Sequence, residues 1–229
     1  MTDHIPVARW LEQRRYGKEL DLLLIVNPTK DLEGAVTEGK MVEKVARSLS
    51  GVTVKALYGG YATKPRVKKE LESGKYDVLH YAGHTAFYSD DPLKSGILCA
   101  GHHVLTGNEL GRMKDLPALV FFDSCESGRI GGLTQEGATA TQRNIGLAES
   151  FLLSGVANYV GTHWVVSDAA APAFVEAFYG ALLQGQPIGA AVSSGRRVVR
   201  ALKSRDWADY IHYGSPDFVL KFPCGETSR

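Results

Sequence analysis

Cysteine is scarce in this sequence: the 229 residues include only three, Cys99, Cys125 and Cys224. They form no CxxC pair and cannot all pair with one another, so a disulfide scaffold and a zinc ribbon are both disfavoured. The adjacent pair His102–His103 is a poor metal site, because neighbouring side chains on a strand point to opposite faces. The sequence therefore predicts a protein of a reducing, cytoplasmic compartment with neither metal nor cofactor.

Excess charge of one sign and long apolar runs are also missing. The formal net charge is +1, which argues against a dedicated nucleic-acid-binding face. No apolar stretch approaches the roughly 18 residues of a membrane span, and the first residues lack a signal-peptide pattern. No strand ends in GxGxxG or GxxxxGK[ST], which disfavours a nucleotide-binding domain. With 44% hydrophobic residues, the chain can bury a sizeable core.

Short apolar segments alternate with segments of helical periodicity. Strands are expected over 20–26, 52–57, 76–83, 117–122, 156–164 and 217–222, with a hairpin-like insertion over 96–105. Helices are expected over 33–49, 64–74, 107–113 (capped by Thr106), 171–185 and 187–202. This alternation predicts a mainly parallel sheet with helices on both faces. Residues 1–19 are interpreted as an N-terminal arm and 20–229 as one domain.

Three polar clusters follow expected strands directly. They are "HYAGHT" (80–85), "DSCESG" (123–128) and "THWVVSD" (162–168). Ligands of open α/β sheets bind at the carboxyl ends of the strands. If these three strands are neighbours, the clusters converge and form the candidate site.

Cys125 and His84 are the candidate nucleophile and base, because a cysteine nucleophile needs a thiolate and usually a histidine to form it. The backbone N–H groups of Thr85 and Cys125 could stabilise an oxyanion. The alternative is a buried free cysteine without a catalytic role, which is common in protein cores. His80 is a second, weaker candidate for the base.

The motifs "HYAGH" and "DSCESG" resemble the histidine and cysteine motifs of caspase-like peptidases, and "DSCESG" is similar to the metacaspase motif. From about Leu20 to Phe222 the chain resembles the CHAT domain, through "DVLHYAGH", "LVFFDSCESG", "AESFLLSGVANYVGTHWVVSD" and "YIHYGSPDF". The resemblance implies a caspase-like three-layer α/β/α sandwich and a cysteine endopeptidase that uses Cys125 and His84. His80 would then point into the sheet or support the base. One departure is Thr85, where relatives usually have glycine.

The resemblance also indicates how a substrate would be chosen. In the caspase-like fold the residue two before the nucleophile lines the P1 pocket, and here it is Asp123, which favours Arg or Lys. Asp168 is a candidate second wall, or an acid favoured at a helix start. Trp164 either flanks the pocket or belongs to the core. Arg129 and Arg143 bracket a glycine-rich loop as processing sites, or are solvated arginines, which we favour.

The partners implied are a protein substrate and a regulatory sensor, either tetratricopeptide repeats or a nucleotide-second-messenger module. The resemblance implies bacterial immune or stress signalling, with CRISPR systems or gasdermin-like targets as options between which the residues do not choose. No membrane contact is expected. The competing function is a catalytically silent caspase-like module that docks partners.

Overall fold

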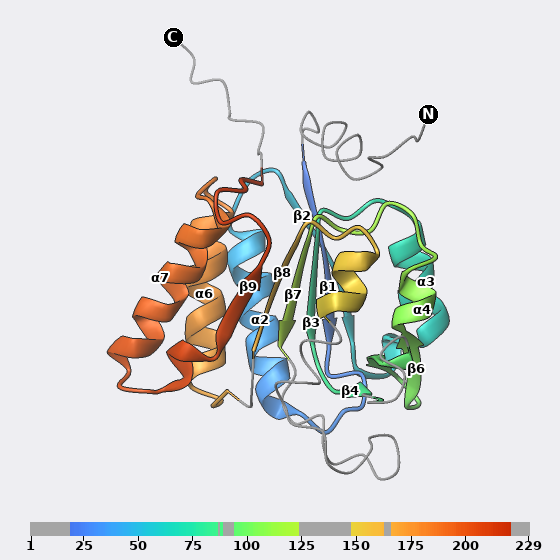
Figure 1. Ribbon diagram of the computed structural model, residues 1–229. Helices are drawn as coiled ribbons and strands as arrows, with labels where there is room; N and C mark the ends of the chain where they lie inside the picture. Colours follow the sequence, from blue (N-terminus) through green and yellow to red (C-terminus); the bar gives the residue numbers. More distant parts are fainter. Residues whose placement is uncertain (1–18, 87, 89–93, 124–147, 163–165, 221–229) are drawn as a thin grey trace, which may run out of the picture.

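The computed structural model describes residues 19–86, 88, 94–123, 148–162 and 166–220. Its centre is a six-stranded sheet in the order β2-β1-β3-β7-β8-β9 (Figure 1). The strands are β1 (Leu20–Val26), β2 (Val52–Tyr58), β3 (Val78–Ala82), β7 (Leu119–Asp123), β8 (Asn158–Thr162) and β9 (Tyr210–Tyr213). Each neighbouring pair is parallel except β8 and β9, which are antiparallel. The mainly parallel sheet expected from the sequence is confirmed.

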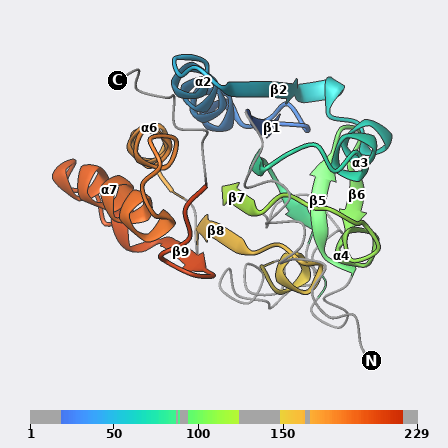
Figure 2. The ribbon, with the colours of Figure 1, turned by 90° about the horizontal axis from the view of Figure 1, so that it is seen from above.

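Helices cover both faces of this sheet (Figure 2). One face carries α2 (Glu33–Arg47), α6 (Ala170–Leu182) and α7 (Ile188–Ala201), and the other carries α3 (Lys64–Glu72), α4 (Gly107–Leu110) and the helical residues 148–153. Two short 3-10 turns, Gly59–Tyr61 and Asp206–Ala208, complete the helical elements that are described. The fold is the three-layer α/β/α sandwich that the sequence predicts.

The alternation of side chains along each strand divides the core in two. Leu22 and Leu24 of β1 face α2 and α6, whereas Leu23 and Ile25 face α3. Both faces of the central strands are buried, which explains why their sequences are nearly continuous apolar runs. The sheet is therefore a rigid platform, and its carboxyl edge is where polar side chains emerge.

A second, antiparallel sheet lies beside the first, in the order β4 (Thr85–Ala86), β5 (Gly96–Cys99) and β6 (His103–Thr106). It confirms the expected hairpin-like insertion. Thr106 caps α4 in a capping box with Glu109, as expected. His102, however, lies in the hairpin turn with φ of 60° and not on a strand, so the strand argument against the histidine pair does not apply to it.

The strand expected over 217–222 is wrong for its described part. Residues 217–220 form no strand, and Tyr210–Tyr213 takes the edge position beside β8 instead. The reason is that carbonyl groups of this segment accept hydrogen bonds from the first turn of α7. The N–H of Ile188 donates to the Phe218 carbonyl (2.9 Å), and that of Gly189 donates to the Pro216 carbonyl (2.8 Å). These carbonyls pair two of the N–H groups that a helix start leaves without partners.

Candidate active site at the carboxyl edge of the sheet

The strands that carry the three polar clusters, β3, β7 and β8, are neighbours in the sheet. Ala82 is in register with Asp123, and the N–H of Gly83 donates to the Asp123 carbonyl at 3.1 Å. The loop that carries His84 is therefore tied to the residue two before Cys125. Cys125 itself lies outside the described residues, as do Trp164, Arg129 and Arg143.

The backbone around His84 is held from several sides. The His84 carbonyl accepts from the N–H of Leu98 (3.0 Å), and the Tyr81 hydroxyl lies 2.5 Å from it. Gly83 allows this arrangement, because a β-carbon there would lie 2.8 Å from the Tyr81 hydroxyl oxygen. The His84 side chain is buried, with 4% of the residue exposed. Its position is thus fixed by the fold, as a candidate base requires.

Asp31 is a site residue that the sequence reasoning missed. Its Oδ2 lies 3.0 Å from His84 Nε2, and its Oδ1 accepts from the Thr29 hydroxyl at 2.5 Å. Burial acts to raise the pKa of Asp31, but hydrogen bonds with Thr29 and His84 outweigh it, so the pKa lies below its usual value. Asp31 is therefore a carboxylate at neutral pH. A carboxylate beside histidine fixes the tautomer and the orientation of the imidazole.

The loop that presents Asp31 is shaped by Asn27. Asn27 follows β1 with φ of 44°, and its Oδ1 accepts from the N–H groups of Asp31 and Leu32, each at 3.1 Å. Asparagine tolerates this left-handed backbone better than most residues. The signal in the sequence was "NPTKD" at the carboxyl end of the first strand, the same sheet edge as the other clusters.

Thr85 lies in β4, paired with Ile97 of β5, and is buried. Threonine favours the extended backbone of a strand, so the branched side chain causes no strain at this position. The departure from glycine is therefore compatible with the local structure. The assignment of its N–H to an oxyanion hole stays a prediction.

Asp123 ends β7 with its side chain on the α2 and α6 face of the sheet, and only 1% of it is exposed. Its Oδ1 lies 3.5 Å from the Thr162 hydroxyl, and its side chain is hydrogen-bonded to that of Glu38 on α2. Glu38 was also missed from the sequence. Its helical position facing the sheet was visible, but its contact with a strand end depends on how α2 packs.

His80 is completely buried on the same face of the sheet. Its ring stacks on Phe121 with centroids 4.8 Å apart, and its Nδ1 lies 3.0 Å from the Tyr179 hydroxyl. Burial lowers the pKa of His80 to about 3, although the charge of Asp123 acts against this. His80 is therefore a neutral core histidine that points into the fold, the position expected for it if His84 is the base.

Asp168 is exposed and lies against the first turn of α2, where a β-carbon on Gly34 would be 2.1 Å from Asp168 Oδ1. Gly34 and Glu38 are four residues apart and so share one face of the helix. Asp168 and Asp123 thus contact the same face of α2 about one turn apart, the first at the surface and the second buried. The acid directly precedes Ala169, the N-cap of α6, and it also lies against the first turn of α2.

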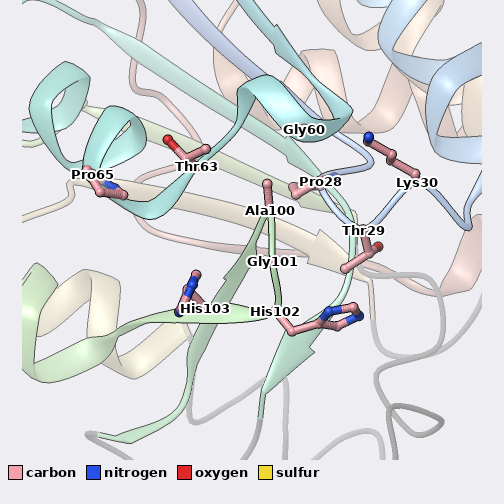
Figure 3. Close-up of a pocket in the computed structure, with 10 residues that line it drawn as sticks. All are labelled: Pro28, Thr29, Lys30, Gly60, Thr63, Pro65, Ala100, Gly101, His102 and His103. Carbon is pink, nitrogen blue, oxygen red and sulfur yellow. The ribbon is translucent and has the colours of Figure 1, made fainter.

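A cavity of about 560 Å³ lies next to this edge (Figure 3). Its walls come from the loop after β1, the start of α3 and the turn between β5 and β6. The described residues that line it include Lys30, His102 and His103 but no carboxylate. Thr29 also lines the cavity and its hydroxyl donates to Asp31, so the cavity borders the loop that carries Asp31.

The described residues contain no group of three or more His, Cys, Asp or Glu side chains arranged to hold a metal ion. None of their helices combines the length and the apolar character needed to cross a membrane.

The chain was compared with known families and structures. Residues 11–215 match the family model described as the CHAT domain. Two structures of the Saccharomyces cerevisiae separase–securin complex align with TM-scores of 0.56 and 0.53, each at 20% identity over 91% of this chain and 13% of the other. A Geobacter sulfurreducens protein aligns with a TM-score of 0.50 and 16% identity, over 90% and 98% of the two chains. No curated protein gives a significant match.

At these identities the structural likeness shows the fold alone. The chain spans 13% of the separase chain it matches, so the activity and partners of the whole separase are not transferred by this likeness.

Proposed function

This chain belongs to the CHAT-domain family, and on that premise we propose that it is a cysteine endopeptidase with Cys125 as nucleophile and His84 as base. The observation that carries the proposal is the placement of His84. It is buried, paired with Asp31 and tied through Gly83 to the carbonyl of Asp123, two residues before the thiol. A histidine held in this way is prepared to take a proton from a group at the end of β7.

The pairing with Asp31 assigns the two ring nitrogens. The carboxylate accepts from Nε2–H, so Nδ1 carries the lone pair and takes the proton from Cys125. The thiolate attacks the scissile carbonyl, and the N–H groups of Thr85 and Cys125 receive the oxyanion. The imidazolium then protonates the leaving amine, and water hydrolyses the acyl-enzyme.

Replacing Cys125 or His84 with alanine tests the proposal. Each variant is expected to remove cleavage of a peptide library and of lysate proteins while the thermal unfolding midpoint stays near that of the wild type. Cys99→Ala is the matched thiol control, because Cys99 is buried in β5 and burial raises its pKa to about 12. Full cleavage by Cys125→Ala would contradict the assignment of the nucleophile. Wild type that neither cleaves nor labels with a thiol probe would favour the silent docking module.

The P1 residue is proposed to be Arg or Lys, with Asp123 at the floor of the pocket and Asp168 at its rim. Their shared face of α2 supports this, since a long cationic side chain can pass one acid and reach the other. Trp164 is kept as a flanking residue of the same pocket. Peptides that differ only at P1 test the preference, and faster cleavage after Leu or Asp than after Arg would contradict it.

The cavity of Figure 3 is proposed to take an acidic side chain of the substrate. In the sheet, β1 and β7 lie on opposite sides of β3. We propose that the cavity lies across the scissile bond from the P1 pocket, because it is lined by the loop after β1 whereas Asp123 ends β7. Lys30 lines it and none of the described lining residues is a carboxylate, which suits a carboxylate or a phosphorylated side chain.

A basic P1 preference makes Arg129 and Arg143 candidate self-processing sites. The intact masses of wild type and Cys125→Ala test this, because self-processing lowers the mass of the wild type alone.

A sensor, either tetratricopeptide repeats or a nucleotide-second-messenger module, would regulate the peptidase in cytoplasmic bacterial immune or stress signalling. Co-purification from a native host, with and without the defence stimulus, tests that role. The N-terminal arm, residues 1–19, also stays a prediction, since residues 1–18 lie outside the described part.

A further inference from the structure

The last turns of α7 carry an apolar stripe that faces solvent. The helix lies at the rim of the molecule (Figure 2), and one of its faces, with Val192 and Val199, is buried in the core. Val198 is 40% exposed, Leu202 is 52% exposed, and Ala201 between them is exposed as well. These three positions follow the spacing i, i+3 and i+4, which places them on one face of the helix. This end of α7 is therefore apolar on a second face.

Exposed apolar side chains are concentrated around this stripe. The described residues include five large apolar side chains that are exposed, and three of them lie between positions 198 and 207: Val198, Leu202 and Trp207. The 3-10 turn that carries Trp207 packs against α7. Exposed apolar residues that occur singly are common, whereas a group on one surface indicates a binding site for a partner.

Positive charge is concentrated on the same segment. Arg197, Arg200, Lys203 and Arg205 are all exposed, and none of them forms an ion pair with another residue of the described ranges. Five other Lys and Arg side chains of the protein do pair with a Glu or Asp. Because the net charge of the whole chain is only +1, this is a local excess that an acidic partner can neutralise.

Two of these cations are positioned by contacts with uncharged groups. The guanidinium carbon of Arg200 lies 5.5 Å from the centre of the Trp207 ring, within the range of a cation–π contact. A terminal nitrogen of Arg197 donates to the Ser194 hydroxyl at 2.9 Å. Neither contact neutralises the charge, so both guanidinium groups keep donors for a carboxylate and have less side-chain freedom to lose on binding.

The stripe and its cations together define the chemistry of the partner. A helix with apolar residues at the same i, i+3 and i+4 spacing can pack along the stripe, and the small Ala201 permits a close approach. Asp or Glu side chains on the flank of that helix would meet Arg197 and Arg200. A symmetric dimer of this chain is disfavoured, because a two-fold axis through the stripe would bring like charges together.

The longer segments outside the described residues lack the charge that this surface requires. Residues 1–18 contain four Lys or Arg against two Asp or Glu, and residues 221–229 contain two against one. Residues 124–147 contain two of each kind. The acidic segment 89–93 has only five residues and includes a proline, which disfavours a helix. The complementary helix therefore comes from outside these 229 residues.

We propose that the outer face of α7 docks an acidic amphipathic helix of a partner protein. We call this face the α7 surface, and it consists of Arg197, Val198, Arg200, Ala201, Leu202 and Trp207. The inference goes beyond the proposed function and does not rest on it, because none of these residues belongs to the candidate active site.

The first experiment selects binders from a phage-displayed library of helical peptides with randomised surface positions. The target is the full chain with Cys125→Ala, which prevents cleavage of the peptides, and the counter-target carries Arg197→Glu and Leu202→Gln in addition. The retained peptides are expected to have an excess of Asp and Glu and apolar residues at i, i+3 and i+4. Peptides without an acidic excess, or none that distinguish the two targets, would overturn the proposal.

The tightest selected peptide then measures the contribution of the stripe by fluorescence anisotropy. Leu202→Gln is expected to weaken binding about tenfold, because the leucine side chain no longer leaves water in the complex. Leu153→Gln is the matched control and should change the affinity by less than about twofold, since Leu153 is 75% exposed on another helical segment. Equal losses in the two variants would contradict docking on α7.

The same peptide measures the contribution of charge. Arg197→Glu combined with Arg200→Glu is expected to weaken binding about tenfold or more at low salt, and to reduce its dependence on salt. Lys40→Glu combined with Lys69→Glu makes the same charge change at exposed positions on α2 and α3, and should have little effect. Equal effects of the two pairs would show a long-range field and overturn a local docking surface.

Other occupants would give different results. Oligouridine or phosphatidylserine-containing vesicles might compete for the cations, so both are titrated into the same variants. Binding of either that is tighter than that of the peptide, and is lost in Arg197→Glu with Arg200→Glu, would overturn the proposal. The mass of the wild type in sedimentation is expected to be unchanged by Leu202→Gln. A dimer that this substitution dissociates would assign the surface to a second copy and also overturn it.

Discussion

His84 Nε2 and Asp31 Oδ2 lie 3.0 Å apart, although 53 residues separate them in the chain. Asp31 follows β1 and His84 follows β3, and these strands are neighbours in the sheet. In the proposed mechanism, Asp31 is a third residue beside the Cys125–His84 dyad, and its role is to orient His84. The strand order, with β1 between β2 and β3, makes this possible.

Asp31→Asn is expected to lower kcat about tenfold or more with little change in KM, because the amide can no longer hold the Nε2–H tautomer as firmly. Steady-state kinetics on one peptide measure this. Asp217→Asn, at an exposed acid in the turn that follows β9, is the matched control and should be neutral. A change confined to KM would indicate that Asp31 contacts substrate and does not orient His84.

Gly34→Ala tests the rim of the proposed pocket. The new β-carbon would lie 2.1 Å from Asp168 Oδ1, so the acid must move away. We expect a higher KM for P1 Arg peptides, and no further increase when Asp168→Ala is added. Gly180→Ala in α6 is the control, because nothing lies within 4 Å of its β-carbon, and it should stabilise the fold by roughly 0.5–1 kcal/mol. If the increases in KM caused by Gly34→Ala and Asp168→Ala are additive, a contact between Gly34 and Asp168 is contradicted.

The stability of the protein should fall as the pH rises from about 6.5 to 8. Glu38 has a folded pKa of about 8 and an ordinary value of 4.5, so folding keeps a proton that the unfolded chain releases in this range. Chemical unfolding should show the free energy of unfolding falling by up to about 1.4 kcal/mol per pH unit. Glu38→Gln removes this slope, so an unchanged slope in that variant would contradict a proton on Glu38.

His80 produces the opposite slope at lower pH. Its pKa falls from 6.5 to about 3 on folding, so its contribution to stability is present above 6.5 and is lost as the pH falls toward 3. Between about pH 4.5 and 6.5 the opposite effects of His80 and Glu38 on the free energy of unfolding cancel. The free energy of unfolding should therefore be nearly constant in this range. Stability that rises through this window in Glu38→Gln but stays level in wild type would support both assignments.

Lys30→Glu should raise KM for peptides that carry an acidic residue across the scissile bond from P1, and leave neutral peptides unchanged. Lys30 is exposed and lines the cavity, so the effect should shrink with added salt. Lys40→Glu, at an exposed position on α2, matches the charge change outside the cavity. Equal effects of the two substitutions would show a long-range charge effect and no local binding site.

Features with a local cause could be predicted well. The buried strands appear as apolar runs, α2 and α7 as helical periodicity, and Thr106 as a cap, because each pattern reflects neighbours within a few residues. The edge strand was misplaced for a non-local reason. Both 210–213 and 217–222 are suitable for a strand, and the contacts of Pro216 and Phe218 with the start of α7 decide between them.

By itself, the sequence determined the order of elements, the mainly parallel sheet, and the residue types at the ends of three strands, because chain connectivity and burial leave a periodic trace. Tertiary structure decided which distant acids meet which histidine. Asp31 joins His84 because β1 lies beside β3, and Glu38 is buried on the face of the sheet that carries the Asp123 side chain because α2 packs on β1, β2 and β3. Such contacts depend on strand order and helix packing, which leave no local pattern for a single sequence to reveal.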